Sequence, residues 1–160
     1  MTSTVEFTLN GRPVRTVVGE AELLCDCLRE RLAQLGTRVG CREGICGSCN
    51  VLLDGRVVRS CLVLAVQAEG SSVTTVAGLA PRGRSQADGL SALQRAFVER
   101  GAVQCGFCTA GILVSAAALL ASEPQPSRAQ VVRALAGNLC RCTGYAKVVD
   151  AVMAAAEGER

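Results

Sequence analysis

The chain contains no histidine and no tryptophan, and it has only three phenylalanines and one tyrosine among its 160 residues. Without histidine, the sequence excludes His-based catalysis, a His-ligated metal site and a Rieske-type centre. The scarcity of aromatic rings leaves no stacking platform for nucleic-acid bases. The arginines behind the net charge of +3 are scattered rather than clustered. Nucleic-acid binding is therefore disfavoured.

Long apolar segments are also missing. The longest apolar run, Ala110–Ala121, is interrupted by Gly111 and Ser115, and it is too short for a membrane span of about 20 residues. No positively charged stretch followed by an apolar stretch marks an export signal. We therefore expect a cytoplasmic protein without a membrane span.

Cysteine, by contrast, is abundant, with ten residues in the chain. Cys41, Cys46 and Cys49 follow the spacing C-x4-C-x2-C, and Cys61 comes after eleven further residues. This is the spacing of plant-type [2Fe–2S] ferredoxins. One loop supplies three thiolates to a compact two-iron core, and a neighbouring element supplies the fourth. Two glycines within the loop permit positive φ and a close approach of backbone N–H groups to the cluster.

Zinc or a disulfide framework fits this first block less well. Two C-x2-C pairs would favour structural zinc, and here only Cys46 and Cys49 form such a pair. Disulfide frameworks belong to small secreted chains, and this chain shows no secretory signal. Two further thiols, Cys25 and Cys27, lie inside a predicted helix, and we interpret them as packing residues because buried free cysteine behaves as a small hydrophobe.

The first half of the chain has the pattern of a mixed sheet with one covering helix. Apolar and polar residues alternate near the N-terminus, as in a half-buried strand. Asn10-Gly11 and Asp54-Gly55 are signals for type I′ hairpin turns. An apolar stripe predicts a helix over about Ala21–Leu35 that ends at Gly36. Further strands are predicted at Pro13–Val18, Val51–Leu53, Arg56–Val58 and Val73–Val76.

The second half has the pattern of four helices. Thr109–Ala121 is apolar nearly all round, so we expect it to be buried in a bundle or against another chain. Ser127 and Gln130 form a capping box at the start of the third helix, and the fourth runs from about Tyr145 to Ala156. A stretch rich in Gly, Pro and polar residues separates the two halves. We therefore divide the chain into a domain over residues 1–76, a linker over 77–88 and a helical domain over 89–160.

A second block of cysteines lies within these helices. Cys105 and Cys108 stand just before one predicted helix, and Cys140 and Cys142 stand just before another. Helix N-termini favour anions and lower thiol pKa values, so two such ends could present four thiolates to one metal centre. The spacing C-x2-C with C-x-C leaves zinc and iron–sulfur equally open. A thioredoxin-like redox site is less favoured because no βαβ pattern surrounds it.

Taken together, the two blocks resemble the iron–sulfur subunit of the xanthine oxidase family of molybdenum hydroxylases, over about residues 4–153. Ser48 and Asn50 stand where Ala and Thr are commoner in this family, and Ala110 replaces a usual Pro. Ser48 and Asn50 could add hydrogen bonds beside the cluster. The matching segments are Gly36–Cys41, Cys46–Cys49, Val51–Gly55, Ser60-Cys61, Gln104–Thr109 and Gly137–Tyr145.

The resemblance implies an α+β fold. Its N-terminal part is a β-grasp plant-type ferredoxin domain, and its C-terminal part is a four-helix bundle with pseudo-twofold symmetry. Each part holds one [2Fe–2S] cluster. The resemblance also implies that Gln104 and Cys142 approach the molybdopterin cofactor. The implied metal ligands are Cys41, Cys46, Cys49, Cys61, Cys105, Cys108, Cys140 and Cys142.

The implied function is electron relay in an oxidoreductase complex. Electrons would pass from a large molybdopterin-binding subunit, through the two clusters, to a medium FAD-binding subunit, in a dimer of heterotrimers. This chain would carry no catalytic residue, because substrate chemistry takes place on a partner chain. Two alternatives stay open at this stage: a free-standing two-cluster electron carrier, and a structural zinc protein that acts as an interaction module.

Overall fold

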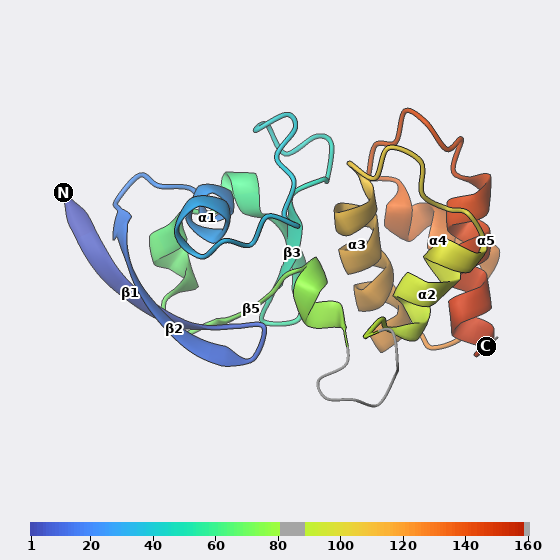
Figure 1. The fold of residues 1–160 in the computed structure, drawn as a ribbon, viewed down its shortest axis with the longest axis horizontal. Helices are drawn as coiled ribbons and strands as arrows, with labels where there is room; N and C mark the ends of the chain where they lie inside the picture. The colour runs from blue at the N-terminus through green and yellow to red at the C-terminus, as the bar shows by residue number, and fades with distance from the viewer. Residues whose placement is uncertain (81–88, 159–160) are drawn as a thin grey trace.

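The computed structural model describes residues 1–80 and 89–158, and these form two lobes that lie side by side (Figure 1). We call residues 1–80 the sheet lobe and residues 89–158 the helical lobe. Residues 81–88, which make up most of the predicted linker, lie outside the described part. Among the described residues, no helix combines the length and apolar character needed to cross a bilayer.

The sheet lobe is built on a mixed five-stranded sheet. Its strands are β1 (Thr2–Leu9), β2 (Arg12–Gly19), β3 (Asn50–Leu53), β4 (Arg56–Arg59) and β5 (Ser72–Thr74). The spatial order is β2-β1-β5-β3-β4. The β1–β2 and β3–β4 pairs are antiparallel hairpins, and β5 runs parallel to β1 and antiparallel to β3. The strands predicted from the sequence are confirmed, although the last one ends before Val76.

Both hairpin turns have the predicted conformation. Asn10 and Gly11 have φ angles of 48° and 67°, and Asp54 and Gly55 have φ angles of 49° and 78°. A type I′ turn needs positive φ at both central residues, and its backbone follows the right-handed twist of the two strands. The Asp54-Gly55 turn has a further consequence, because it returns the chain to the loop that carries the first three cysteines.

The helix predicted over Ala21–Leu35 is wrong in its extent. The structure has only a short helix α1 (Leu24–Asp26), which continues as a π-helical turn η1 (Cys27–Arg31). Ala33, not Gly36, adopts the left-handed conformation after this segment, with φ of 53°. The apolar stripe continues beyond the point where the backbone leaves the helix, so the sequence pattern predicts a helix that is too long.

Tertiary hydrogen bonds explain the early end. The backbone N–H of Gln34 donates to the carbonyl of Leu28 at 2.7 Å. The side-chain Oε1 of Gln34 accepts from Asn10 Nδ2 at 3.0 Å and from Thr75 Oγ1 at 3.1 Å. The segment after η1 therefore binds the end of the sheet instead of extending the helix. Three short 3₁₀ turns complete the lobe: η2 (Ser60–Leu62), η3 (Ala65–Ala68) and η4 (Val76–Leu79).

The helical lobe contains the four predicted helices. They are α2 (Ala92–Glu99), α3 (Thr109–Ser122), α4 (Arg128–Leu135) and α5 (Ala146–Glu157). The capping box at the start of α4 is confirmed: Ser127 Oγ accepts from the N–H of Gln130, and Gln130 Oε1 accepts from the N–H of Ser127. A second box, Ser91 with Gln94, opens α2 in the same way.

Helix α3 lies at the centre of the molecule, between the sheet lobe and the other helices (Figure 1). Its residues from Gly111 to Ala116 are all buried. One side of α3 packs on β3 and β4, and the other side packs on α2 and α4. The expected burial is therefore met within the chain for residues 111–116 of this helix, whereas residues 117–120 are half-buried and residues 121–122 are exposed.

A buried polar network joins the two lobes beside α3. Asn50 Nδ2 donates to Ser115 Oγ at 2.8 Å, and Ser115 Oγ lies 2.8 Å from Asn138 Oδ1. Asn138 Nδ2 in turn donates to the carbonyl of Gly47 at 3.1 Å. The hydrogen bonds that Asn50 adds therefore connect the lobes.

Arg59, at the end of strand β4, adds further hydrogen bonds to this junction between the lobes. Its guanidinium donates to the carbonyl of Gly44 at 2.8 Å, to Asn50 Oδ1 at 3.1 Å and to the carbonyl of Gly137 at 2.8 Å. One side chain thus contacts the cysteine loop, strand β3 and the helical lobe together.

Candidate metal centres

The first candidate centre is built around the loop of residues 41–49, at the end of the sheet lobe (Figure 1). The backbone N–H groups of Glu43 and Cys46 both donate to Sγ of Cys41, each at 3.4 Å. These N–H groups, the one of Cys46 first, lower the pKa of Cys41 to about 6. The loop therefore stabilises a thiolate, which is the form of cysteine that binds metals.

Positive φ angles give this loop its shape. Arg42, Gly44 and Gly47 have φ angles of 58°, 75° and 72°. A Cβ on Gly44 would collide with the side chain of Leu62, and one on Gly47 would collide with the carbonyl of Gly137 in the helical lobe. Both positions favour glycine because of their positive φ. At Gly47 space also requires it, because the carbonyl of Gly137 is backbone, whereas the Leu62 side chain near Gly44 can move.

The fourth cysteine of this set, Cys61, lies in η2, directly after the β3–β4 hairpin. Its thiol contacts that of Cys49, and the thiol of Cys41 contacts that of Cys46. Burial, together with the contact with Cys49, raises the pKa of Cys61 to about 11. We call Cys41, Cys46, Cys49 and Cys61 the first centre. Its four sulfurs meet in two pairs.

The second candidate centre lies where two helices begin. Cys108 is the N-cap residue of α3, with Cys105 three residues earlier. Cys140 and Cys142 lie in the loop before α5. Sγ of Cys142 is 3.5 Å from Sγ of Cys105, and the thiol of Cys108 contacts that of Cys140. We call these four residues the second centre, and its sulfurs also meet in two pairs.

The thiols of the second centre differ in their surroundings. Burial raises the pKa of Cys108 to about 12. Burial acts on Cys140 in the same direction, but hydrogen bonds from the side chain and backbone of Thr143 outweigh it, and the pKa is lowered to about 7. The hydroxyl of Thr143 lies 3.1 Å from Sγ of Cys140. The backbone N–H of Phe107 lowers the pKa of Cys105.

Tyr145 holds the loop before α5 in place, a role that the sequence pattern did not predict. Its hydroxyl accepts from the N–H of Cys140 at 2.7 Å and donates to the carbonyl of Asn138 at 3.0 Å. Its own backbone is left-handed, with φ of 67°. A signal was available, because this is the one tyrosine of the chain and it follows the cysteine block directly.

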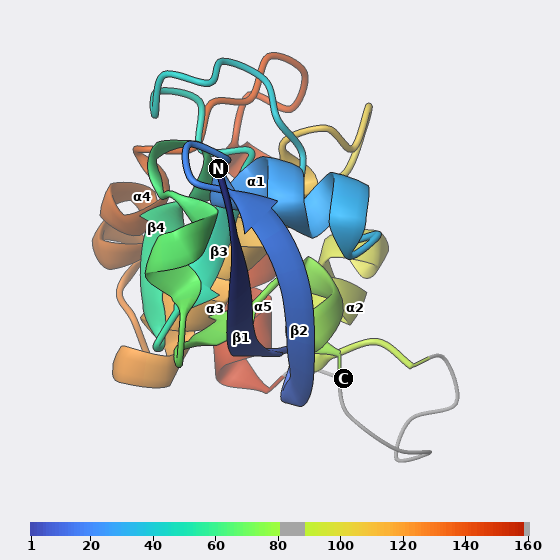
Figure 2. The ribbon, with the colours of Figure 1, turned by 90° about the vertical axis from the view of Figure 1, so that its left-hand side faces the viewer.

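The two centres are neighbours. The loop of residues 41–49 and the loop before α5 project on the same side of the molecule in both views (Figure 1, Figure 2). The N–H of Leu139 donates to the carbonyl of Cys46 at 2.9 Å. A cavity of about 330 Å³ lies between the loops. Its lining includes six of the eight predicted ligands: Cys41, Cys46, Cys105, Cys108, Cys140 and Cys142.

This arrangement fits two-iron clusters better than single metal ions. Sulfurs that meet two by two suit a core in which each iron takes two thiolates, and N–H groups aimed at the sulfurs offset the negative charge. A structural zinc ion needs four ligands around one point.

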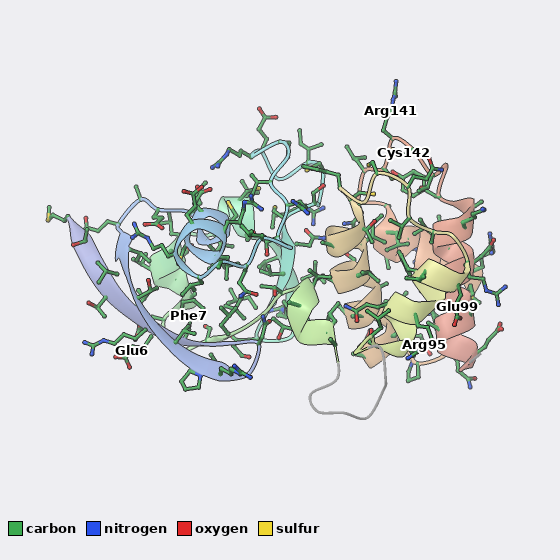
Figure 3. All side chains as sticks on the ribbon, in the orientation of Figure 1. Glu6, Phe7, Arg95, Glu99, Arg141 and Cys142 are labelled. Atoms are coloured by element: carbon green, nitrogen blue, oxygen red, sulfur yellow. The ribbon has the colours of Figure 1, made fainter. Side chains whose placement is uncertain are left out.

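The remaining residues singled out from the sequence lie at the edges of these centres. Gln104 and Cys142, which are predicted to approach a pterin, are both exposed. Cys142 and its neighbour Arg141 lie at the top of the helical lobe in this view, where Arg141 points away from the protein (Figure 3). Cys25 and Cys27 are fully buried, as expected for packing residues.

Comparison with known families gives two matches that together span most of the chain. The model of a 2Fe-2S iron-sulfur cluster binding domain matches residues 7–77. The model of a [2Fe-2S] binding domain matches residues 75–153. Each match contains one of the two cysteine sets.

Several similar proteins match this chain over most of both lengths. The small subunit of nicotine 6-hydroxylase from Paenarthrobacter nicotinovorans is 47% identical over 150 residues, which are 93% of this chain and 87% of that protein. The iron-sulfur-binding subunit of xanthine dehydrogenase from Escherichia coli O157:H7 is 43% identical over 95% of this chain and 93% of its own length. A chain of quinoline 2-oxidoreductase from Pseudomonas putida 86 superposes with a TM-score of 0.91 at 48% identity, over 98% of this chain and 95% of that one.

Proposed function

This chain belongs to the family of small iron–sulfur subunits of xanthine dehydrogenase-type molybdenum hydroxylases, and from that membership we propose how its residues conduct electrons. It is an electron-transfer subunit of an oxidoreductase complex. When bound, the two [2Fe–2S] clusters supply one-electron chemistry that amino-acid side chains do not provide. The protein supplies the ligands, their charge compensation and the spacing between the centres.

We assign one cluster to each centre. Cys41, Cys46, Cys49 and Cys61 ligate the first cluster, and Cys105, Cys108, Cys140 and Cys142 ligate the second. The pairing of the sulfurs within each set supports this assignment. The N–H groups of Glu43, Cys46 and Phe107, together with the side chain and backbone of Thr143, stabilise the thiolates.

The single observation that carries the relay is the hydrogen bond between Leu139 and Cys46. The carbonyl of Cys46 accepts from the N–H of Leu139 at 2.9 Å, and Leu139 precedes Cys140 in the chain. A ligand of the first centre is thus connected to a ligand of the second through covalent backbone and one hydrogen bond. This short connection gives electrons a compact route between the two lobes.

The same membership supports a proposal for the finer architecture. We infer that the sheet lobe is a β-grasp domain, because a mixed sheet is covered by a helix and carries the ligand loop at its end. We infer that the helical lobe is a four-helix bundle. The proposed boundaries remain 1–76 for the first domain, 77–88 for the linker and 89–160 for the second domain.

The partners that we propose are a large molybdopterin-binding subunit at the second centre and a medium FAD-binding subunit at the first, in a dimer of heterotrimers. Exposed Gln104 and Cys142 would face the pterin. Apolar side chains are exposed at both centres, as expected for surfaces that pack against other subunits. They are Ile45 and Leu62 at the first centre, and Phe107 and Leu139 at the second.

The metal content of the full chain tests this function. After anaerobic reconstitution with iron and sulfide, we expect about four irons and four acid-labile sulfides per chain, because each [2Fe–2S] cluster contributes two of each. Reduction with dithionite should give two distinct paramagnetic species in electron paramagnetic resonance spectra. Zinc without acid-labile sulfide, or a single paramagnetic species, would contradict the assignment.

A further inference from the structure

A fifth thiol lies beside the first centre. Cys25 lies in α1, and its side chain is fully buried. Helix α1 packs against η2, the turn that carries Cys61. Cys25, Cys49 and Cys61 form one buried group, separate from the core of the sheet lobe to which Cys27 belongs. Two thiols on the same short helical segment thus have different neighbours.

The present contacts of Cys25 hold it weakly. Its S–H donates to Oδ1 of Asp26 over 3.7 Å, and a thiol is a weak donor even at a shorter distance. The carboxylate of Asp26 is engaged mainly by the guanidinium of Arg42, at 2.8 and 2.9 Å. The hydrogen bond to Asp26 therefore holds the thiol of Cys25 only weakly.

The position of Cys25 distinguishes between the two sulfur pairs of the first centre. Cys49 and Cys61 are each only 2% exposed. Cys41 and Cys46 are less buried and line the cavity that the two centres share. Cys25 lies on the buried side, next to the Cys49–Cys61 pair. A substitute ligand from α1 would therefore serve one iron of the cluster and not the other.

We propose that Cys25 is a reserve ligand of the first centre, able to bind the buried iron when Cys49 or Cys61 is lost. The proposal rests on the proposed iron–sulfur function. In the exchange, the S–H bond of Cys25 breaks and one iron–sulfur bond forms at the vacant position. The proton passes to Oδ1 of Asp26, which already accepts from the thiol, and from that partly exposed carboxylate to solvent. The iron keeps its oxidation state. Iron in such clusters prefers thiolate ligands, which favours Cys25 over nearby oxygen atoms.

The test uses the full-length chain after anaerobic reconstitution. Cys49→Ala and Cys61→Ala are each prepared alone, with Cys25→Ala, and with Cys27→Ala as the matched buried control. Iron, acid-labile sulfide and the paramagnetic signal of the first centre are measured in every sample. The signal of the second centre reports in the same samples whether the helical lobe has formed.

At least one single variant should keep both clusters, with an altered spectrum for the first. Adding Cys25→Ala should then halve the iron content, whereas adding Cys27→Ala should leave it unchanged. Loss of the first cluster from both single variants would overturn the proposal, as would retention that does not depend on Cys25. Cys46→Ala should lose the first cluster whether or not Cys25 is present. Failure of the unaltered chain to bind two clusters would instead overturn the proposed function.

Discussion

Two residues other than glycine adopt a left-handed backbone beside the cysteine ligands, and each is held there by its side chain. Arg42 forms a two-pronged ion pair with Asp26. Tyr145 places its hydroxyl between Cys140 and Asn138. The left-handed conformation costs an L-residue about 1–2 kcal/mol. These contacts therefore offset a local cost at the positions that shape each ligand loop.

Substitution of Arg42 separates the two effects. Arg42→Ala removes the ion pair and keeps the unfavourable φ, whereas Arg42→Gly removes the same ion pair and relieves the backbone. The greater freedom of glycine in the unfolded chain cancels part of its advantage. We expect Arg42→Gly to be more stable than Arg42→Ala by roughly 0.5–1 kcal/mol. Urea unfolding of the reconstituted chains measures the difference, and equal midpoints would show that the loop relaxes around residue 42.

Among the elements, helix α3 lies in close backbone contact with the cysteine loop through its first turn. A Cβ on Gly111 would collide with the backbone carbonyl of Gly47. A carbonyl in the ligand loop cannot move away as a flexible side chain could. Gly111 therefore permits the close contact between α3 and the first centre.

Gly111→Ala should consequently destabilise the chain and disturb the first centre. Forcing an extra methyl group into a packed contact costs about 1–3 kcal/mol. The loop that carries Cys46 and Cys49 should shift, so the spectrum of the first cluster should change more than that of the second. Gly19→Ala is the matched control, because its Cβ would meet only ordinary contacts at 3.7 Å or beyond. A Gly111→Ala chain as stable as this control would show that α3 can move away from the cysteine loop without loss of stability.

The elements also show which features can be read from sequence. Asn10-Gly11 specified its turn because few other residue pairs tolerate two positive φ angles, and Ser127 with Gln130 specified a helix start through local hydrogen bonds. The cysteine blocks could be found by spacing, because metal ligands are constrained in sequence as well as in space. The end of η1 could not be predicted in this way, because it depends on contacts of Gln34 with residues far away in the chain.

At the scale of the whole molecule, the relative position of the two lobes depends on buried polar groups. The Asn50, Ser115 and Asn138 side chains are buried, and each is hydrogen-bonded to the next. No local pattern in the sequence indicates that these three residues meet. Their partners lie 65 and 23 positions apart, so the network is visible only in the folded chain.

Removal of the central hydroxyl tests this junction. Ser115→Ala would leave Nδ2 of Asn50 and Oδ1 of Asn138 without their partner, and a buried polar group left unpaired costs about 1–3 kcal/mol. Ser122→Ala on the same helix is the control. Its exposed hydroxyl contacts only carbonyls of its own helix, so we expect a change within about 0.5 kcal/mol. Urea unfolding compares the two variants, and similar midpoints would argue against a structural role for the network.

The contact between the ligand loop and Gly137, Asn138 and Leu139 has a consequence for biosynthesis. The ribosome delivers the N-terminal part of a chain first, and that part begins to fold before the rest is made. All four cysteines of the first centre have been synthesised once Cys61 is added. The segment that contacts their loop, from Gly137 to Leu139, is synthesised more than seventy residues later. A nascent chain therefore carries all four ligands of the first centre before it can form the contacts of their loop with Asn138 and Leu139.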